Sequence, residues 1–226
     1  MSQNSPLQNI NKINDFRDNV KKYIFFNIFI FWTFEVKCSN MFLSWRTEIM
    51  NFEKHIQTQD IELRFPTIDM ARDLSDLVCR NQEEFKYIYY TKTLTEVQKC
   101  EEALKTMAER FEKGEGHYGY MIFKDNSLIG YAGIKVRPGE HVAEMSYYLD
   151  KQHTGNGYVS KAIKALEDIF FAQDGHRSEI FCNETNENSC KVAKRLGYQL
   201  DGVMREYEFV DGAYQGVAIY SKINGE

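Results

Sequence analysis

The stretch from 142 to 171 places the strongest constraint on how this chain can fold. Its first residues alternate between a more polar face (Val142, Glu144, Ser146, Tyr148) and an apolar one, which predicts a half-buried strand. Two glycines at 155 and 157 then allow a tight turn. The helix predicted after them has one apolar stripe, formed by Val159, Ala162, Ile163, Leu166, Ile169 and Phe170. A strand that runs through glycines into a helix directs several free N–H groups at one point, so we expect an anion to bind there.

The glycine turn does not match either of two common phosphate-binding sequences. A dinucleotide-binding G-x-G-x-x-G turn would need a glycine where Ser160 stands, and a P-loop would need Gly-Lys-Ser or Gly-Lys-Thr. What remains is Gln152-x-x-Gly155-x-Gly157 after an amphipathic strand. The expected anion is therefore one that the backbone binds, and a dinucleotide or a nucleoside triphosphate is a poor candidate.

Composition limits the class of protein further. With 226 residues, of which 43% are hydrophobic and 14% aromatic, the chain can bury a core and is not of a disordered class. Its net charge of −5 provides no basic surface for nucleic acid. The five cysteines form no C-x-x-C pair and the histidines are scattered, so we expect no disulfide framework, no metal and a cytoplasmic location.

Residues 1–49 differ in character from the rest of the chain. They include the aromatic and apolar run 23–34, which is shorter than the ~20 residues that a membrane-crossing helix needs. Three interpretations stay open: a membrane anchor, an element added to the domain, or a start site placed too early, with Met41 and Met50 as other starts. We favour an early start site or a poorly ordered extension, expect no membrane association, and place the folded domain at 50–226.

The remaining pattern predicts an α+β fold. Strands are expected at 61–65, 118–124, 128–136, 142–149, 179–182, 204–210 and 213–223. Helices are expected at about 70–78, 95–111, 158–171 and 186–196. The expected caps are Thr67 or Asp69, Thr95 with Gln98 as a capping box, Asn186, and Gly114 as a C-terminal stop. This order predicts a mixed, mostly antiparallel sheet of about seven strands, flanked by four helices, with a parallel strand–helix–strand unit at its centre.

Four pieces of this pattern, in this order, resemble the GNAT N-acetyltransferases, which use acetyl-CoA. They are the opening strand and turn 63–69, the strand 128–133, the strand end and glycine turn 148–157, and the helix 186–198, with Asn-x-x-Ser at its start and Leu-Gly-Tyr at its end. Within that family the chain most resembles the ribosomal-protein-alanine acetyltransferases. The resemblance covers Ile61 to about Ile223, implies the GNAT fold, and leaves the residues to about Met50 without a counterpart.

The resemblance implies acetyl-CoA as cosubstrate and assigns residues to it. Backbone N–H groups from His153 to Tyr158 would bind the pyrophosphate, while main-chain groups near Tyr148 would pair with the pantetheine arm and supply an oxyanion donor. The predicted cofactor-binding residues are Tyr148, Leu149, Gln152, His153, Thr154, Gly155, Asn156, Gly157, Tyr158 and Asn186. A plain N-cap role stays open for Asn186, and His153 is expected to be solvated rather than catalytic.

Attack of an amine on a thioester needs a base and a donor for the departing thiolate. An alkyl amine with a pKa near ~10 is protonated at neutral pH and must first lose a proton. Glu144 is the predicted base, because a carboxylate in mid-strand is unusual unless it faces a cleft; a solvent-facing or salt-bridged carboxylate is the alternative. Ser189 is the predicted acid, or else a serine that supports the helix start. The tyrosine that many relatives carry one turn later is replaced by Ala193.

The segment between the first two helices corresponds to the acceptor site of the family that the chain resembles. Its acidic and aromatic side chains would suit a cationic amine, although aromatic residues belong more often to a core. The predicted substrate-binding residues are Glu84, Tyr87 and Tyr89, with Glu83 and Tyr90 beside them. The acceptor stays open among a protein N-terminus, a polyamine and an aminoglycoside-like molecule, and we expect a monomer or a homodimer. A non-catalytic acyl-CoA-binding protein and a membrane-tethered acetyltransferase are the alternative functions.

Overall fold

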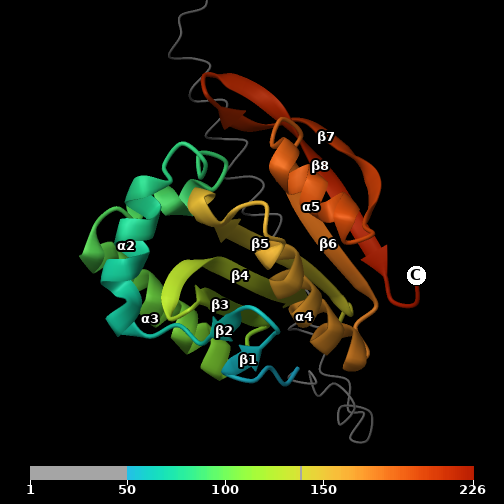
Figure 1. Ribbon diagram of the computed structural model, residues 1–226. Coiled ribbons are helices and arrows are strands. Elements are labelled where there is room, and N and C mark those ends of the chain that lie inside the picture. Colours follow the sequence, from blue (N-terminus) through green and yellow to red (C-terminus); the bar gives the residue numbers. More distant parts are fainter. Residues whose placement is uncertain (1–49, 138) are drawn as a thin grey trace, which may run out of the picture. The chain divides into compact units, whose positions relative to one another are not determined.

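The computed structural model describes residues 50–137 and 139–226, which form one mixed sheet with helices on both faces (Figure 1). In chain order the described strands are β1 (His55–Gln57), β2 (Glu62–Arg64), β3 (His117–Lys124), β4 (Ser127–Arg137), β5 (Val142–Leu149), β6 (Arg177–Asn183), β7 (Gln199–Val210) and β8 (Ala213–Ile223). The described α-helices are α2 (Ala71–Arg80), α3 (Val97–Lys113), α4 (Tyr158–Ala172) and α5 (Glu187–Arg195), and short 3-10 turns are η1 (Ile68–Met70), η2 (Tyr89–Thr93) and η3 (Lys151–His153). The predicted fold class is confirmed. The predictions made for residues 1–49 concern a part of the chain outside the described residues.

The sheet has the order β1-β2-β3-β4-β5-β6-β8-β7 among the described strands. Among the strands of residues 50–137 and 139–226, the one parallel pair is β5 with β6, joined by α4, so the predicted strand–helix–strand crossover is confirmed. That pairing covers only Val142–Met145 of β5 and Arg177–Ile180 of β6. The sheet has eight strands rather than about seven, because the short strand β1 pairs with β2 ahead of the regular pattern.

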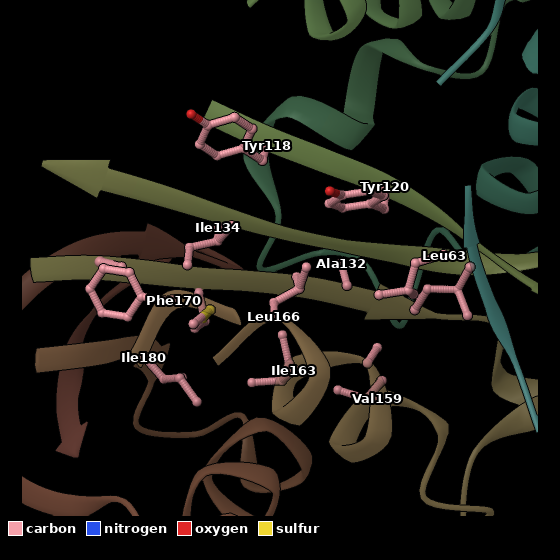
Figure 2. Close-up of a cluster of buried hydrophobic side chains, with 14 of the residues drawn as sticks. Leu63, Tyr118, Tyr120, Ala132, Ile134, Val159, Ile163, Leu166, Phe170 and Ile180 are labelled. Carbon is pink, nitrogen blue, oxygen red and sulfur yellow. The ribbon is translucent and has the colours of Figure 1, made fainter. Parts of the chain in front are cut away.

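The sheet buries two separate hydrophobic clusters, one on each face. On one face, α4 packs its apolar stripe on the central strands; Figure 2 shows Val159, Ile163, Leu166 and Phe170 of α4 in the same cluster as strand residues such as Ile134. The other face is covered by α2 and α3. That second cluster includes Leu74, Leu77, Cys100, Leu104, Met121 and Tyr148. Burial of Cys100 as a free thiol agrees with its predicted place on the stripe of α3.

The predicted helix ends are partly correct. Asn186 caps α5, since its side chain accepts a hydrogen bond from the Ser189 N–H, and Gly114 ends α3 in the left-handed conformation. The capping box at Thr95 is wrong: α3 begins at Val97 after Glu96, without a side-chain cap. The carbonyl of Thr95 instead accepts a hydrogen bond from the Ser75 hydroxyl, which holds this segment against α2 as a loop. No side-chain cap hydrogen bond is made from Thr67, and α2 itself starts after Met70 rather than after Thr67 or Asp69.

A buried ion pair fastens the end of β5 to the end of α2. Asp150 follows β5 directly, its side chain is 1% exposed, and Arg80 Nε lies 2.7 Å from its Oδ2 atom. The other carboxylate oxygen accepts the N–H of Gln152 at 3.1 Å, and Asn81 Oδ1 accepts the N–H of Lys151 at 2.9 Å. Burial alone would raise the pKa of Asp150, but the hydrogen bonds from Arg80 and Gln152 outweigh it and hold that pKa below its ordinary value. Hydrogen bonds therefore hold both Lys151 and Gln152, the first residues of the segment that leads into the glycine turn.

Replacing Asp150 tests this attachment. We expect Asp150→Ala to lower the free energy of unfolding by about 2 kcal/mol at neutral pH, because it removes two charge-assisted hydrogen bonds from a buried position. The folded-state pKa lies below the unfolded one, so the contribution is complete above the ordinary value of 3.8 and is lost as the pH falls through the lower folded-state pKa. Urea unfolding of wild type and variant at several pH values measures this. Asp168→Ala, which removes an exposed carboxylate on α4, is the control, and an equal loss in both variants would contradict the prediction.

Candidate active site

The site is built around an opening in the sheet between β5 and β6. Both strands continue past their last paired residues, Met145 and Ile180, but they no longer bond to each other. β5 stays paired with β4 as far as Leu149, and β6 stays paired with β8 as far as Asn183. The backbone edges that face this opening are therefore available to a ligand. Ligands in open α/β sheets commonly bind where adjacent strands diverge at their carboxyl ends.

The glycine turn lies at the carboxyl end of β5, where the chain enters α4. Gly155 and Gly157 have φ values of 83° and 75°, and a Cβ atom on either would meet no other atom within 4 Å, so the space above them is open. The N–H groups of His153 and Thr154 are already bonded to carbonyls of the preceding turn. Among the described contacts, the N–H groups from Gly155 to Tyr158 have no acceptor. Of the predicted stretch 153–158, the N–H groups without an acceptor among the described contacts are thus those of 155–158.

The remaining predicted cofactor residues surround this turn. Gln152, Thr154 and Asn156 are exposed on its surface, and Leu149 and Tyr158 are partly buried at its two ends. The imidazole of His153 is about a third exposed, with Nδ1 lying 3.9 Å from Asp150 Oδ2. Asn186 caps α5 on the β6 side of the opening. The predicted residues therefore come from both sides of the diverging strands.

Glu144 lies on the face of β5 that α2 and α3 cover in part. It shares this face with Ser146 and Tyr148, as the alternation of the strand predicts, and it is partly buried. Its neighbours in register are Lys135 of β4 and Glu179 of β6, yet it makes no ion pair within the described part of the chain. Glu179, by contrast, is paired with Arg137 and Arg177. The salt-bridge interpretation of Glu144 therefore fails within the described residues, where its carboxylate has no ion-pair partner.

One tyrosine to which the sequence interpretation gave no role, Tyr131, lies on the same face of the sheet as Glu144. The ring of Tyr131 stacks on Tyr148 with centroids 5.2 Å apart. It fits because a Cβ at Gly119 would come within 3.1 Å of its hydroxyl and one at Gly133 would overlap it. Burial raises the pKa of Tyr131, and a hydrogen bond with Ser146 offsets part of that rise. The charge of Glu144 raises the pKa of Tyr131 further.

Tyr90 completes an aromatic pocket on this face. It is 49% exposed, yet its hydroxyl is surrounded by protein, and this burial raises its pKa, with Tyr131 and Glu144 adding to the effect. The pocket has a volume of about 390 Å³ and is lined mainly by Tyr90, Tyr131, Tyr148, Leu74 and Met107, with Lys99 and Glu102 at its polar side. It lies between η2, α3 and the sheet, and none of the predicted substrate-binding residues Glu84, Tyr87 and Tyr89 lines it.

The three predicted substrate-binding residues are placed differently from one another. The hydroxyl of Tyr87 lies 3.2 Å from Thr185 Oγ1, which joins this segment to the loop after β6. Glu84 lies 3.4 Å from the ammonium of Lys151, beside the glycine turn. Tyr89 is 85% exposed and does not line the pocket, whereas its neighbour Tyr90 does. Tyr131 could be found only from the strand register, because the pairing of β3 with β4 is what places Gly119 and Gly133 beside its ring.

Ser189 lies on the other side of the opening, in the first turn of α5. Its Oγ atom is 2.8 Å from the hydroxyl oxygen of Tyr147, which lies in the part of β5 that does not pair with β6. Cys182 of β6 and Cys190 of α5 are adjacent, with their sulfur atoms 3.4 Å apart. Burial raises the pKa of Cys182 to about 12, and Cys190 adds to the rise. These groups form a hydroxyl and thiol cluster across the sheet from Glu144.

Residues 50–137 and 139–226 contain neither a metal-type cluster of side chains nor a membrane-spanning helix. No group of three or more histidine, cysteine or acidic side chains is arranged to hold a metal ion there. Within the same residues, no helix is long and apolar enough to cross a membrane.

Comparison with known proteins identifies the family. The family model described as an acetyltransferase (GNAT) domain matches residues 60–199. The ribosomal-protein-serine acetyltransferase of Escherichia coli is 31% identical over 74% of this chain and 94% of its own length. A probable N-acetyltransferase of Bacillus subtilis, YjcK, is 28% identical over 51% of this chain and 66% of its own length.

Solved structures agree with the sequence relatives. The ribosomal-protein α-N acetyltransferase RimL in complex with coenzyme A superposes with a TM-score of 0.71 at 25% identity, covering 75% of this chain and 97% of that one. The microcin self-immunity acetyltransferase MccE, in complex with acetyl-CoA and AMP, shares the fold with a TM-score of 0.71 at 21% identity, covering 78% and 99%. The diverging strands, the glycine turn and these matches together show that the chain belongs to the GNAT acetyltransferase family.

Proposed function

We propose that this protein is an N-acetyltransferase that moves the acetyl group of acetyl-CoA to a primary amine by direct attack in a ternary complex. The observation that carries the proposal is the opening between β5 and β6, which has an anion-binding turn at its end and Glu144 and Ser189 on its two sides. Two structural neighbours were solved with coenzyme A or acetyl-CoA, which supports the same cosubstrate here.

The cosubstrate would lie along the opening and end on the glycine turn. The free N–H groups of 155–158, at the start of α4, would bind its pyrophosphate, since a helix N-terminus favours negative charge. Backbone groups of Tyr148 and Leu149 and the side chain of Asn186 would contact the pantetheine arm. Gln152, His153 and Thr154 would flank the phosphates. In this arrangement the thioester would reach residues 146–149, the part of β5 that does not pair with β6.

The chemistry divides between the two faces of the sheet. Glu144 would take the proton of the ammonium group, directly or through a water, because a protonated amine has no lone pair for attack. A backbone N–H near Tyr148 would stabilise the oxyanion as the amine adds to the carbonyl. Ser189 would donate a hydrogen bond to the sulfur as the carbon–sulfur bond breaks. The amine reaches the carbonyl from the side of the aromatic pocket.

The proposed acceptor is the N-terminus of a protein. The relative that is 31% identical over nearly its whole length is named for acetylating a ribosomal protein, which favours this class over a polyamine or an aminoglycoside-like molecule. The rings of Tyr90 and Tyr131 beside Glu144 would suit the cationic amine before it loses its proton. We also propose that 50–226 is the catalytic domain, that 1–49 is an extension of it, and that the enzyme works in the cytoplasm as a monomer or homodimer.

An acceptor screen with acetyl-CoA tests the function. Free thiol is followed with peptides of different N-terminal residues, polyamines and aminoglycosides, and we expect transfer to at least one peptide. Glu144→Gln should lower kcat about a hundredfold, since it removes the base. Glu140→Gln, which removes an exposed carboxylate in the turn before β5, is the control and should not change kcat.

Three outcomes would contradict parts of this proposal. Tight coenzyme A binding without thiol release for any amine would show a non-catalytic binding protein. Transfer to polyamines or aminoglycosides alone would refute the protein acceptor. Recovery of full-length protein in the membrane fraction of cells, with its N-terminus verified by mass spectrometry, would refute the cytoplasmic location in favour of a tethered enzyme.

Coenzyme A binding to the glycine turn has its own test. Gly157→Ala should weaken binding about tenfold, because a methyl group and a strained backbone disturb the free N–H groups that face the phosphate. Gly139→Ala is a matched control: Gly139 has a φ of 76° against 75° for Gly157, and a Cβ at either position would meet no neighbour within 4 Å. Both variants carry the same backbone strain, so calorimetric titration with coenzyme A should show weaker binding for Gly157→Ala alone. Equal affinities would argue against this turn as the phosphate site.

A further inference from the structure

A tyrosine that no motif singled out lies directly against Ser189. The hydroxyl oxygen of Tyr147 is 2.8 Å from Ser189 Oγ, a contact in which either oxygen can be the donor, and its proton also reaches the Ser189 carbonyl oxygen, which can only accept, at the longer distance of 3.2 Å. Tyr147 follows the last β5 residue that pairs with β6, so its backbone belongs to the edge of the opening. Helix α5 has no phenol of its own one turn beyond Ser189, because the buried Ala193 stands there. The phenol beside the serine therefore comes from the strand.

We propose that Tyr147 is a positioning residue for the acetyl transfer, donating its hydrogen bond to Ser189 Oγ so that the serine's own proton is directed at the departing sulfur. The inference rests on the proposed function. A serine hydroxyl has one proton and two lone pairs, so it can accept from Tyr147 and donate to another atom at the same time. With the opposite polarity, the serine proton would be committed to the phenol and would not reach a thiolate.

The surroundings of Tyr147 keep its phenol protonated. Burial raises the pKa of Tyr147, and its hydrogen bond with Ser189 offsets only part of the rise. Tyr147 therefore acts as a hydrogen-bond donor and not as a source of protons. When the carbon–sulfur bond breaks, its electron pair leaves with the sulfur, and the hydrogen bond from Ser189 stabilises the thiolate until water protonates it after release. The ammonium group loses two protons in all, one before the attack and one from the nitrogen of the adduct, and each passes through Glu144 to water.

The nearby thiols compete weakly for the serine proton. The pKa of Cys182 is raised to about 12, first by burial and then by Cys190, against a hydrogen bond from Ser189 that acts to lower it. Cys182 is consequently a neutral thiol at ordinary pH, and a neutral thiol accepts hydrogen bonds poorly. A thiolate is charged and accepts strongly. The serine hydroxyl can thus leave Cys182 when a coenzyme A thiolate forms beside it.

A double-mutant cycle on Tyr147 and Ser189 tests the proposal with the full chain. We expect Tyr147→Phe to lower kcat about tenfold and to leave the KM for acetyl-CoA unchanged, because the lost hydrogen bond matters when the thiolate forms. Ser189→Ala should lower kcat at least as much, and Tyr147→Phe should add no further loss in the Ser189→Ala background. Tyr120→Phe is the matched control: its buried hydroxyl donates to the Glu53 carbonyl at 2.8 Å, so its loss should leave kcat unchanged.

Other results would overturn the proposal. An unchanged kcat in Tyr147→Phe would do so, and so would a loss of the same size with and without Ser189. A lower melting temperature together with weaker coenzyme A binding, but with kcat intact, would show a role in packing alone and would also overturn it. Failure of the proposed function looks different, because the wild type would then transfer acetyl groups to none of the amines before any variant is compared.

Discussion

The early end of the β5–β6 pairing is the constraint on which the rest of the site depends. β5 pairs with β4, and β6 pairs with β8, along the full length of each strand. β5 and β6 share only four residue pairs with each other. A parallel pair also requires the crossover through α4, which fixes where the helix begins relative to the strand end. The positions of the opening, the glycine turn and the N-terminus of α4 therefore all follow from this one parallel crossover.

The opening separates two chemical environments that meet at the strand edge. On the α2 and α3 side, Glu144 shares its face of the sheet with Tyr131 and Tyr148 and lies outside the described ion pairs. On the α4 and α5 side, Ser189 lies among a phenol and two thiols. Because side chains alternate along β5, one strand supplies both Glu144 and Tyr147, on opposite faces. The ion pair of Asp150 with Arg80 holds the start of the glycine turn, so the backbone of the turn keeps its position relative to the side chains of β5.

Local signals predicted the parts of the site that depend on backbone geometry. Gly155, Gly157 and Asn186 were identified because a positive φ and a helix cap each require particular residue types. The roles of Tyr131 and Tyr147 could not be predicted in this way. Tyr131 depends on two glycines brought beside it by strand register, and Tyr147 depends on a helix that comes 40 residues later, since its contact is with a residue 42 positions away. The false capping box at Thr95 failed for the same reason, because a tertiary contact from Ser75 overrode a local preference.

Amide hydrogen exchange, followed by NMR with and without coenzyme A, tests the central claim most directly. If the cosubstrate lies in the opening with its phosphates on the turn, coenzyme A should slow exchange at Gly155 to Tyr158 and at the amides of 146–149 that face β6. The amides at the tip of the β7–β8 hairpin, Asp211 and Gly212, should be unchanged. Protection confined to other parts of the chain, or none between 146 and 158 at saturating coenzyme A, would contradict this account of the site.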